Sequence, residues 1–369
     1  MRGYRLRQVV RPGCCRGCGR SSHLIAEALG ACADCIRAKP EEVLPPIREF
    51  HAESRKAFGL PAEPPQAVGG APCTLCVRQC HISEGALGYC GLRTSHDGKL
   101  VHLGGTRRDG ILHWYYDPLP TNCVAGWVCA EGAHHGFKNL AVFYGACGFN
   151  CLFCQNWSYR ELAQARTPKL TAEELADQVD AATACICFFG GDPSPQIGHA
   201  IAASQLALKK AGSRPLRICW ETNGSMNPRV LRHAARLAMD SGGTVKFDLK
   251  AWDDNLHEAL CGVSNRRTLE NFRWLAEFGK QRREPPLAVA STLLVPGYVD
   301  AREVGEIARF IASIDPAIPY SLLGFHPHFF MTNLATTSRR HAEQCEKAAR
   351  EASLANVHMG NRHLLSDAY

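Results

Sequence analysis

Long apolar runs, tandem repeats and low-complexity tracts are all missing from this chain of 369 residues. Without a run of about 18 apolar residues, no membrane span is predicted. The opening residues are basic but contain neither an apolar core nor a small-residue cleavage site, so we expect no secretion signal and a cytoplasmic protein. Hydrophobic residues make up 46% and charged residues 21%, which excludes wholesale disorder.

Charge of one sign is only in mild excess, with a formal net charge of +7. Such an excess suits an anionic ligand or RNA and requires neither. Part of it lies beside the first cysteines, at Arg2, Arg5, Arg7, Arg11, Arg16 and Arg20. Because a basic run of this kind is most often a solvated face, nucleic-acid binding is an open but not a favoured expectation.

Cysteine, in contrast, is abundant, with 19 residues. In a reducing compartment, thiols favour metal or iron–sulfur ligation over disulfides. Random placement would give roughly one C-x-x-C pair. The chain has four such pairs, which begin at Cys15, Cys32, Cys73 and Cys151. This grouping predicts several separate metal sites.

Composition divides the chain into three regions. Residues 1–66 are expected to form a zinc-ribbon-like cysteine module with a short helix at 41–58 and a proline-rich linker. Residues 67–138 carry a second four-cysteine segment. Residues 139–369 alternate between strand and helix signals, which is typical of one α/β domain.

The third region contains six predicted strand–helix units. Such repetition implies a parallel sheet with right-handed crossovers, either an open sheet or a partial barrel, and places the chemistry at the carboxyl ends of the strands. The predicted strands cover 140–144, 185–189, 216–220, 244–250, 287–295 and 320–325, and the helices 172–182, 197–211, 227–239, 268–278, 301–314 and 338–354.

A three-cysteine loop follows the first of these strands directly. Cys147, Cys151 and Cys154 have C-x3-C-x2-C spacing, which lets three thiolates converge on one cluster. Three thiolates on a [4Fe–4S] cluster leave one iron open, as in a catalytic site. The alternative is a structural zinc site that takes a fourth ligand from His134 or His135.

This loop, with aromatic Phe153 before its last cysteine, resembles the radical S-adenosylmethionine (radical SAM) superfamily. The resemblance covers about residues 138–369 and is greatest to the branch of pyruvate formate-lyase activating enzymes and AmmeMemoRadiSam proteins. It implies a partial (β/α)6 barrel, preceded here by small cysteine-rich metal-binding modules. The implied cofactors are a [4Fe–4S] cluster and S-adenosylmethionine.

Later strand ends also resemble motifs of this superfamily. Gly190, Gly191 and Asp192 are similar to its GGE motif, whose backbone and carboxylate receive the methionine ammonium; here Asp192 replaces Glu. The resemblance implies that Glu221 or Asn223, at the next strand end, bonds the ribose hydroxyls. Alone, such residues are more often a tight turn or a strand end in solvent.

Two further motifs complete the resemblance. Asp248 and Lys250 match a "DLK" strand end, where Lys250 would face the methionine carboxylate. Their spacing of two places both side chains on one face of the strand. His326 matches a histidine that approaches the adenosine, although His328 competes for that role and a packed histidine is an equal alternative.

Two cysteine quartets precede the barrel. Cys73, Cys76, Cys80 and Cys90 resemble a segment of the same branch and suit a structural Zn²⁺ or a closed auxiliary iron–sulfur cluster, with zinc slightly favoured. His81 is a substitute ligand, and unligated thiols are the alternative. The other quartet, Cys15, Cys18, Cys32 and Cys35, has the spacing of a zinc ribbon. Cys14 is a substitute for Cys15 as a ligand, and the nearby His23 is not expected to be one.

The remaining cysteines carry weaker expectations. Cys123 and Cys129 either join a cluster or line a substrate entrance. Cys261 follows the fourth strand and is a candidate hydrogen donor. Small core residues are expected at Cys185, Cys187, Cys219 and Cys345.

The reaction implied by the resemblance is reductive cleavage of S-adenosylmethionine to a 5′-deoxyadenosyl radical, which abstracts hydrogen from a small molecule, a nucleoside or RNA. A flavodoxin or ferredoxin would supply the electron. One alternative is an activase that acts on a glycyl-radical enzyme, and another is a non-catalytic iron–sulfur or zinc protein. Residues 155–171 lack the ferredoxin-type cysteines of many activases, which favours a substrate of the chain's own.

Overall fold

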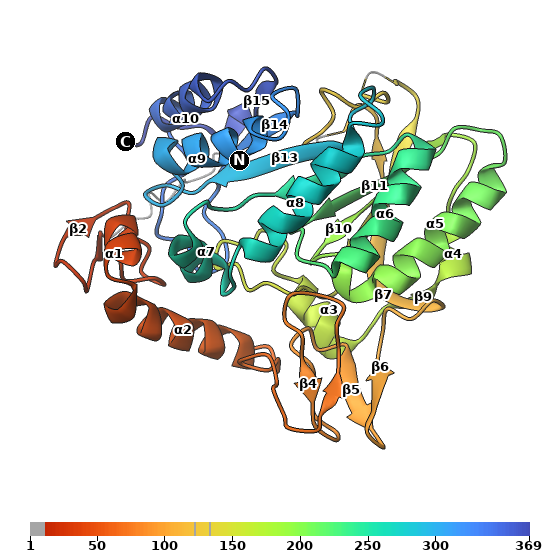
Figure 1. Ribbon diagram of the computed structural model, residues 1–369, viewed down its shortest axis with the longest axis horizontal. Helices are drawn as coiled ribbons and strands as arrows, with labels where there is room; N and C mark the ends of the chain where they lie inside the picture. Colours follow the sequence, from red (N-terminus) through yellow and green to blue (C-terminus); the bar gives the residue numbers. More distant parts are fainter. Residues whose placement is uncertain (1–11, 122, 133) are drawn as a thin grey trace, which may run out of the picture.

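A nine-stranded sheet forms the centre of the protein in the computed structural model, which describes residues 12–121, 123–132 and 134–369. Its strand order is β15-β14-β13-β12-β11-β10-β8-β7-β9, so neighbouring strands follow one another along the chain as in a barrel (Figure 1). The parallel strands are β8 (Lys138–Tyr144), β10 (Thr183–Gly190), β11 (Arg217–Thr222), β12 (Val245–Asp248), β13 (Ala288–Leu294), β14 (Tyr320–Gly324) and β15 (Val357–Gly360).

Two antiparallel strands extend the sheet beyond β8. β7 (Asp109–Pro118) pairs antiparallel with β8, and β9 (Lys169–Thr171) pairs antiparallel with β7. The expected boundary at residue 138 therefore falls between two hydrogen-bonded strands. The expected α/β barrel of strand–helix units is present, and it carries one more parallel strand, β15, than the six expected.

Helices cover the outer face of the sheet (Figure 1). Their apolar sides pack on the strands in one continuous core. The predicted helix at 172–182 stops at Ala176, because a turn held by the Asp180 carboxylate follows it. The helices are α3 (Tyr159–Ala165), α4 (Ala172–Ala176), α5 (Ile197–Ala211), α6 (Pro228–Ser241), α7 (Asp254–Cys261), α8 (Arg266–Gly279), α9 (Ala301–Ala312) and α10 (Arg339–Glu351), with short 3₁₀ turns at Ser194–Gln196 and Arg362–Leu364.

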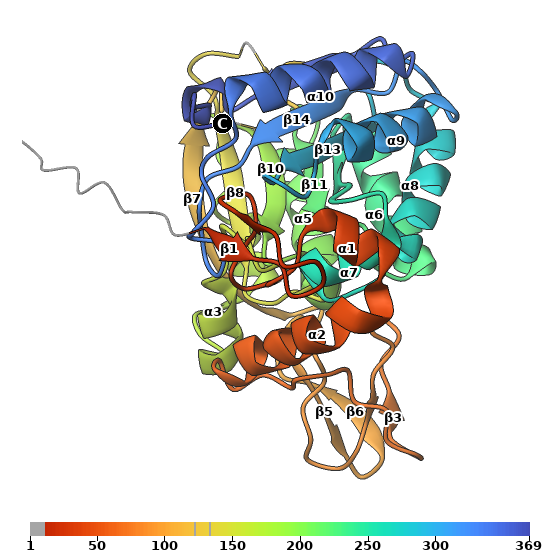
Figure 2. The ribbon, with the colours of Figure 1, turned by 90° about the vertical axis from the view of Figure 1, so that its left-hand side faces the viewer.

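The first cysteine module packs against the barrel beside α7 (Figure 2). The Tyr298 hydroxyl accepts from the Ala26 N–H at 2.8 Å and donates to the Ala31 carbonyl at 2.9 Å. Arg37 pairs with the buried Glu303 at 2.9 Å. The module consists of β1 (Gly13–Cys14), β2 (Ser21–Ser22), α1 (Ala33–Ala38) and α2 (Pro40–Lys56), which corresponds to the predicted helix at 41–58.

The second cysteine segment projects from the barrel below α3 (Figure 1). Its longer hairpin turns at Asp97 and Gly98, both with positive φ, as a tight hairpin requires. The segment consists of β3 (Ala71–Pro72), β4 (His81–Ile82), β5 (Arg93–His96) and β6 (Lys99–His102).

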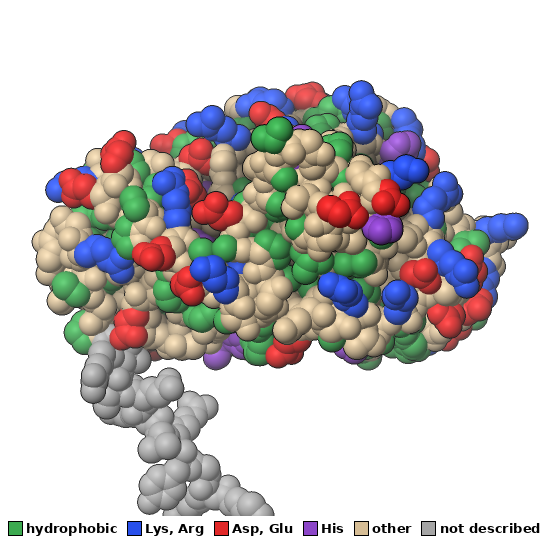
Figure 3. All heavy atoms as spheres, turned by 90° about the horizontal axis from the view of Figure 1, so that it is seen from below, with side chains coloured by type: hydrophobic (Ala, Val, Ile, Leu, Met, Phe, Trp, Pro, Cys, Tyr) green, Lys and Arg blue, Asp and Glu red, His purple; other side chains and the backbone are tan. Residues whose placement is uncertain are grey.

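The surface carries charges of both signs. Figure 3 shows the face seen from below Figure 1, where Lys and Arg side chains alternate with Asp and Glu. Of the N-terminal arginines, Arg2, Arg5, Arg7 and Arg11 lie outside the described residues, and Arg20 lies 3.4 Å from Asp34. Within the described ranges, no helix has the length and apolar character needed to cross a membrane.

Candidate active site and metal centres

The catalytic loop, residues 145–154, lies at the carboxyl end of β8. Backbone hydrogen bonds fix it to the end of α7: the Asn150 N–H donates to the Cys261 carbonyl at 2.9 Å, and the Leu152 N–H donates to the Leu260 carbonyl at 3.0 Å. From the other side, the Tyr159 hydroxyl donates to the Phe149 carbonyl at 3.1 Å. These hydrogen bonds hold the loop between α7 and the start of α3.

Its three thiols, Cys147, Cys151 and Cys154, face one cavity of about 190 Å³. Their sulfur atoms, all described, do not lie within 4.8 Å of one another as a set. Ligands of a single tetrahedral zinc have sulfurs about 3.8 Å apart. The wider spacing suits thiolates on separate irons of a cluster. His134, the expected zinc ligand, instead pairs with Glu131.

Polar groups around the loop favour the thiolate of Cys151, whereas burial raises the pKa of Cys147 and Cys154. The Phe149 N–H donates to the Cys147 sulfur at 3.3 Å, and the Asn223 amide donates to it at 3.6 Å. A hydrogen bond with Cys261, followed by the Lys250 charge, lowers the pKa of Cys151 to about 7. Arg160 is fully buried, and its Nε has no partner among the described residues. A negatively charged cluster would give this buried cation an anionic partner.

The second strand end brings the backbone close to the loop. Gly190 has φ +105°, and a Cβ there would lie 2.6 Å from the Tyr144 nitrogen. A Cβ on Gly191 would lie 2.1 Å from the Ala146 carbonyl oxygen. Only glycine fits at both positions, so bare backbone lines the cavity here.

Asp192 joins the second and third strand ends. One carboxylate oxygen accepts from the Thr222 hydroxyl at 2.7 Å and the Asn223 N–H at 2.9 Å, and the other accepts from the Ser194 N–H at 2.9 Å. Burial raises the pKa of Asp192. The carboxylate lines the cavity with its remaining lone pairs.

Lys250 and Asp248 form the fourth strand end. The Lys250 ammonium donates to Asp248 at 2.9 Å, and the Ser291 hydroxyl donates to the other Asp248 oxygen at 2.8 Å. Burial alone would lower the pKa of Lys250, but the Asp248 carboxylate and the nearby thiols raise it well above its usual value. The ammonium lies 5.8 Å from the centre of the Phe153 ring.

The structure thus brings nearly all of the predicted barrel residues to one cavity. His326 is exposed, bonds its neighbour Pro327 and is not among the residues that line this cavity; Leu323 of β14 is. Cys261 is buried behind the loop at the end of α7 and is also not part of the lining.

A second cavity of about 280 Å³ lies inside the barrel and shares Asn156, Phe189 and Glu221 with the first. Sequence reasoning missed this chamber. The four cysteines expected in the core are all buried, and three of them, Cys185, Cys187 and Cys219, also line the chamber. The thiols that line the chamber belong to Cys123, Cys129, Cys185, Cys187 and Cys219.

Lys246 is buried in the wall of this chamber, with its side chain 1% exposed. Its ammonium donates to the sulfurs of Cys187 at 3.0 Å and Cys123 at 3.2 Å, and lies 3.4 Å from the Glu221 carboxylate. Burial alone would lower the pKa of Lys246, but the neighbouring thiols and the Glu221 carboxylate raise it well above its usual value. Lys246, Asp248 and Lys250 occupy every second position, so all three side chains lie on one face of an extended strand. This spacing is the sequence signal that points to Lys246 as a further residue of the barrel interior.

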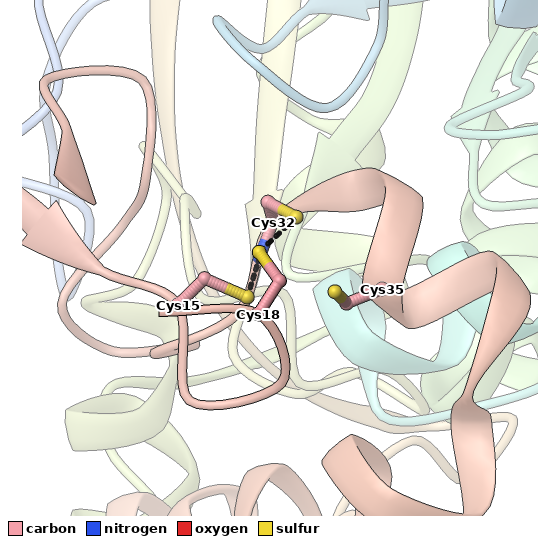
Figure 4. A group of neighbouring side chains, drawn as sticks. All are labelled: Cys15, Cys18, Cys32 and Cys35. Atoms are coloured by element: carbon pink, nitrogen blue, oxygen red, sulfur yellow. Dashed lines mark hydrogen bonds between the residues drawn. The ribbon is translucent and has the colours of Figure 1, made fainter. Parts of the chain in front are cut away.

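The N-terminal quartet, Cys15, Cys18, Cys32 and Cys35, has its four sulfurs within 4.8 Å of one another (Figure 4). The sulfurs of Cys18 and Cys32 are 4.0 Å apart, close to the spacing on one tetrahedral ion. The substitute Cys14 is exposed and bonds the Gly19 carbonyl, and His23 is not part of the group. This quartet can bind a single metal ion.

The second quartet, Cys73, Cys76, Cys80 and Cys90, lines one small cavity beside the catalytic loop. No three of its sulfurs, all described, lie within 4.8 Å of one another. His81, the substitute ligand, does not line this cavity.

Comparison with known proteins agrees with this arrangement. Residues 141–311 match the Radical SAM superfamily. The isethionate sulfite-lyase activating enzyme of Desulfovibrio desulfuricans is 36% identical over 139 residues, which are 37% of this chain and 40% of that protein. The pyruvate formate-lyase 1-activating enzyme of Escherichia coli is 28% identical over 203 residues, which are 52% of this chain and 77% of that protein.

A similar solved structure is a radical SAM methyltransferase from Sphaerobacter thermophilus, with 18% identity and a TM-score of 0.46 over 60% of this chain and 66% of that one. The match to this chain spans less than half the length of the isethionate sulfite-lyase relative. Residues 141–311 thus match the radical SAM domain, and the chain is similar to pyruvate formate-lyase activating enzymes, as its motifs predict. That superfamily implies a [4Fe–4S] cluster and S-adenosylmethionine.

Proposed function

We propose that the three thiols of the catalytic loop hold a [4Fe–4S] cluster and that the chain acts on a small substrate of its own. The observation that supports the cluster is the spacing of the three sulfurs, too wide for one ion, in a cavity at the strand ends. When bound, the cluster and S-adenosylmethionine supply reductive cleavage of the sulfonium and abstraction of a substrate hydrogen atom. The protein's part is to position these groups and exclude water.

Each strand end has a proposed role in holding S-adenosylmethionine. The backbone at Gly190 and Gly191, with the Asp192 carboxylate, receives the ammonium group of the methionine part. The Lys250 ammonium receives its carboxylate. Glu221 and Asn223 bond the ribose hydroxyls, and Phe153 lines the same cavity. These roles suit the cavity because Asp192 lies at the second strand end and Lys250 at the fourth.

The interior chamber supports a small substrate. It shares three lining residues with the first cavity, so a molecule inside it lies next to the cofactor site. A chamber of about 280 Å³ is close to the lower limit of small-molecule sites and is too small for a folded protein. A flavodoxin or ferredoxin is the proposed electron donor.

The second candidate function is activation of a glycyl-radical enzyme. It is favoured by the names of the relatives, which include activating enzymes for isethionate sulfite-lyase and pyruvate formate-lyase. The two functions differ in the size of the substrate, because an activase must accept a segment of a protein partner.

One experiment separates these functions. The full chain, loaded with iron and sulfide under anaerobic conditions, is incubated with S-adenosylmethionine and dithionite, and 5′-deoxyadenosine is measured. A cell extract divided by ultrafiltration is then added. We expect the low-molecular-weight fraction to stimulate product formation. Stimulation by the protein fraction alone, with a glycyl radical detected by electron paramagnetic resonance, would establish the activase instead. No cleavage under any condition would reject both.

For the N-terminal quartet we propose Zn²⁺. Four thiolates on one ion complete a tetrahedral shell and leave no open position, as in structural zinc sites. Burial alone would raise the pKa of Cys15, but hydrogen bonds from backbone N–H groups, that of Cys32 first, lower it to about 6. Such a site ties the module's loops together beside the barrel.

A further inference from the structure

The second quartet encloses a cavity that shares a wall with the catalytic loop. Gly148, which follows the first cysteine of that loop, lines the cavity together with Tyr89 and Arg93. A Cβ on Gly148 would lie 3.5 Å from the Cys76 sulfur. The Arg78 guanidinium fixes this contact by donating to the Gly148 carbonyl at 2.7 Å.

The sulfur spacing in this cavity matches a cluster better than a single ion. The N-terminal quartet, which suits one zinc, brings four sulfurs within 4.8 Å. The catalytic loop does not meet that limit, and neither does any set of three from the second quartet, all of whose residues are described. Thiolates on separate irons of a cluster lie further apart than thiolates on one zinc, so the second quartet and the catalytic loop both lack the close spacing of a single-ion site.

The charge around the cavity calls for an anion. Arg93 is 1% exposed, and its guanidinium donates to the carbonyls of Leu92 at 2.7 Å, Gly104 at 2.8 Å and Pro195. Its Nε has no partner among the described residues, as is also true of Arg160 beside the catalytic loop. A buried cation is normally paired, and four thiolates on a metal cluster carry net negative charge.

A backbone group also points at a ligand sulfur. The Tyr89 N–H donates to the Cys80 sulfur at 3.5 Å. Hydrogen bonds to ligand sulfurs stabilise the thiolate form and tune the potential of iron–sulfur clusters. The Val77 N–H donates to the Ser225 carbonyl at 2.9 Å, so the segment is anchored to the barrel.

We infer that the second quartet holds a second [4Fe–4S] cluster, with a protein thiolate on every iron, rather than the zinc ion that the sequence slightly favours. No iron of this cluster is open, so it does not bind S-adenosylmethionine. It lies directly behind the catalytic loop. This inference goes beyond the proposed function and does not depend on it, because it concerns which metal the four thiols hold.

The test is a metal count on the full chain, purified and loaded with iron and sulfide anaerobically. We expect about eight irons and about one zinc per chain, since each of the two clusters carries four irons. The double variant Cys80→Ser/Cys90→Ser should lose about four irons and keep its zinc. The matched control is Cys14→Ser, which changes an exposed thiol outside every quartet and should alter neither count.

Electron paramagnetic resonance of the dithionite-reduced wild type decides the matter even if the double variant fails to fold. Two signals are expected, and S-adenosylmethionine should shift only one. Four irons with two zincs per chain, a double variant that loses zinc in place of iron, or a single cluster signal that S-adenosylmethionine shifts would overturn the inference. A lack of any shift with S-adenosylmethionine, at eight irons, would count against the proposed function alone.

Discussion

The N-terminal quartet and the catalytic loop use the same ligand in two geometries. In the quartet, two C-x-x-C turns from separate segments enclose one small space, and four sulfurs lie within 4.8 Å. In the loop, one short segment carries three sulfurs that stay further apart and face a cavity lined by residues of five strands, β10 to β14. The first arrangement is closed and holds a fold together, whereas the second keeps room for a reactant.

The largest effect that can break this comparison is at the loop. Cys151→Ala removes one cluster ligand, so we expect no detectable 5′-deoxyadenosine and a loss of about four irons, with zinc unchanged. The measurements are product formation and metal content. Cys345→Ala, a buried thiol on α10 far from either site, is the control and should retain both. Loss of zinc in Cys151→Ala would show that the metals are wrongly assigned.

The converse change is at the quartet. Cys32→Ser should release zinc and lower the free energy of unfolding by about 3 kcal/mol or more, because binding of a structural zinc contributes directly to folding. Chemical denaturation with zinc analysis measures this, and Cys14→Ser is the matched control. Iron content and cleavage of S-adenosylmethionine in the folded fraction should persist. If cleavage disappears while the iron stays, the quartet is more than a structural site.

A smaller effect is expected at the wall of the first cavity. Lys250→Met removes the cation proposed to hold the methionine carboxylate, and loss of one charged hydrogen bond should raise KM for S-adenosylmethionine about 10- to 100-fold. The iron content should stay at the wild-type value. An unchanged KM would remove Lys250 from the binding site. Lys209→Met, on the exposed side of α5, serves as the control.

The smallest expected effect concerns His51, which connects the N-terminal module to the catalytic loop. His51 of α2 bonds the Ala259 carbonyl and the Asn150 side chain of the catalytic loop. Burial lowers the pKa of His51 from 6.5 to about 4, so the unfolded chain binds more protons between these values and stability falls as pH falls from about 6.5. The contribution of His51 to the free energy of unfolding is therefore about 2 kcal/mol lower at pH 5 than at pH 7.5.

Chemical denaturation of the wild type and His51→Gln at pH 7.5 and pH 5 measures this difference. The variant should lose about 2 kcal/mol less than the wild type over this range. An equal loss in both proteins would assign the pH dependence to other groups, such as the buried His257, whose pKa burial also lowers to about 4.

Much of this architecture follows from sequence because local signals agree with long-range ones. The six predicted strands have apolar runs that end in polar or glycine residues, and all six occur. β15 is not predicted, because its four residues, Val357–Gly360, are too few to show a hydrophobic periodicity. The sequence pattern does not predict β7, although Ile111 to Tyr116 are mostly good strand formers. The reason is that β7 pairs antiparallel with β8 and lies outside the repeating strand–helix pattern.

Side-chain direction was the harder part of the site. Spacing located the loop thiols, and the family resemblance pointed to the Asp248–Lys250 pair. Spacing did not show that Cys185, Cys187 and Cys219 line a chamber, because a strand inside a barrel is apolar on both faces. Nor did it show that His326 turns away, since its place depends on the backbone after β14.

The clamp on the catalytic loop has one practical consequence. Arg78 and the end of α7 grip the loop through main-chain oxygen and nitrogen atoms, none of which belongs to a thiol ligand. Stripping the iron would therefore leave the binding shape standing. Apoprotein made in air should accept fresh iron and sulfide after thiol reduction, without passing through an unfolded chain.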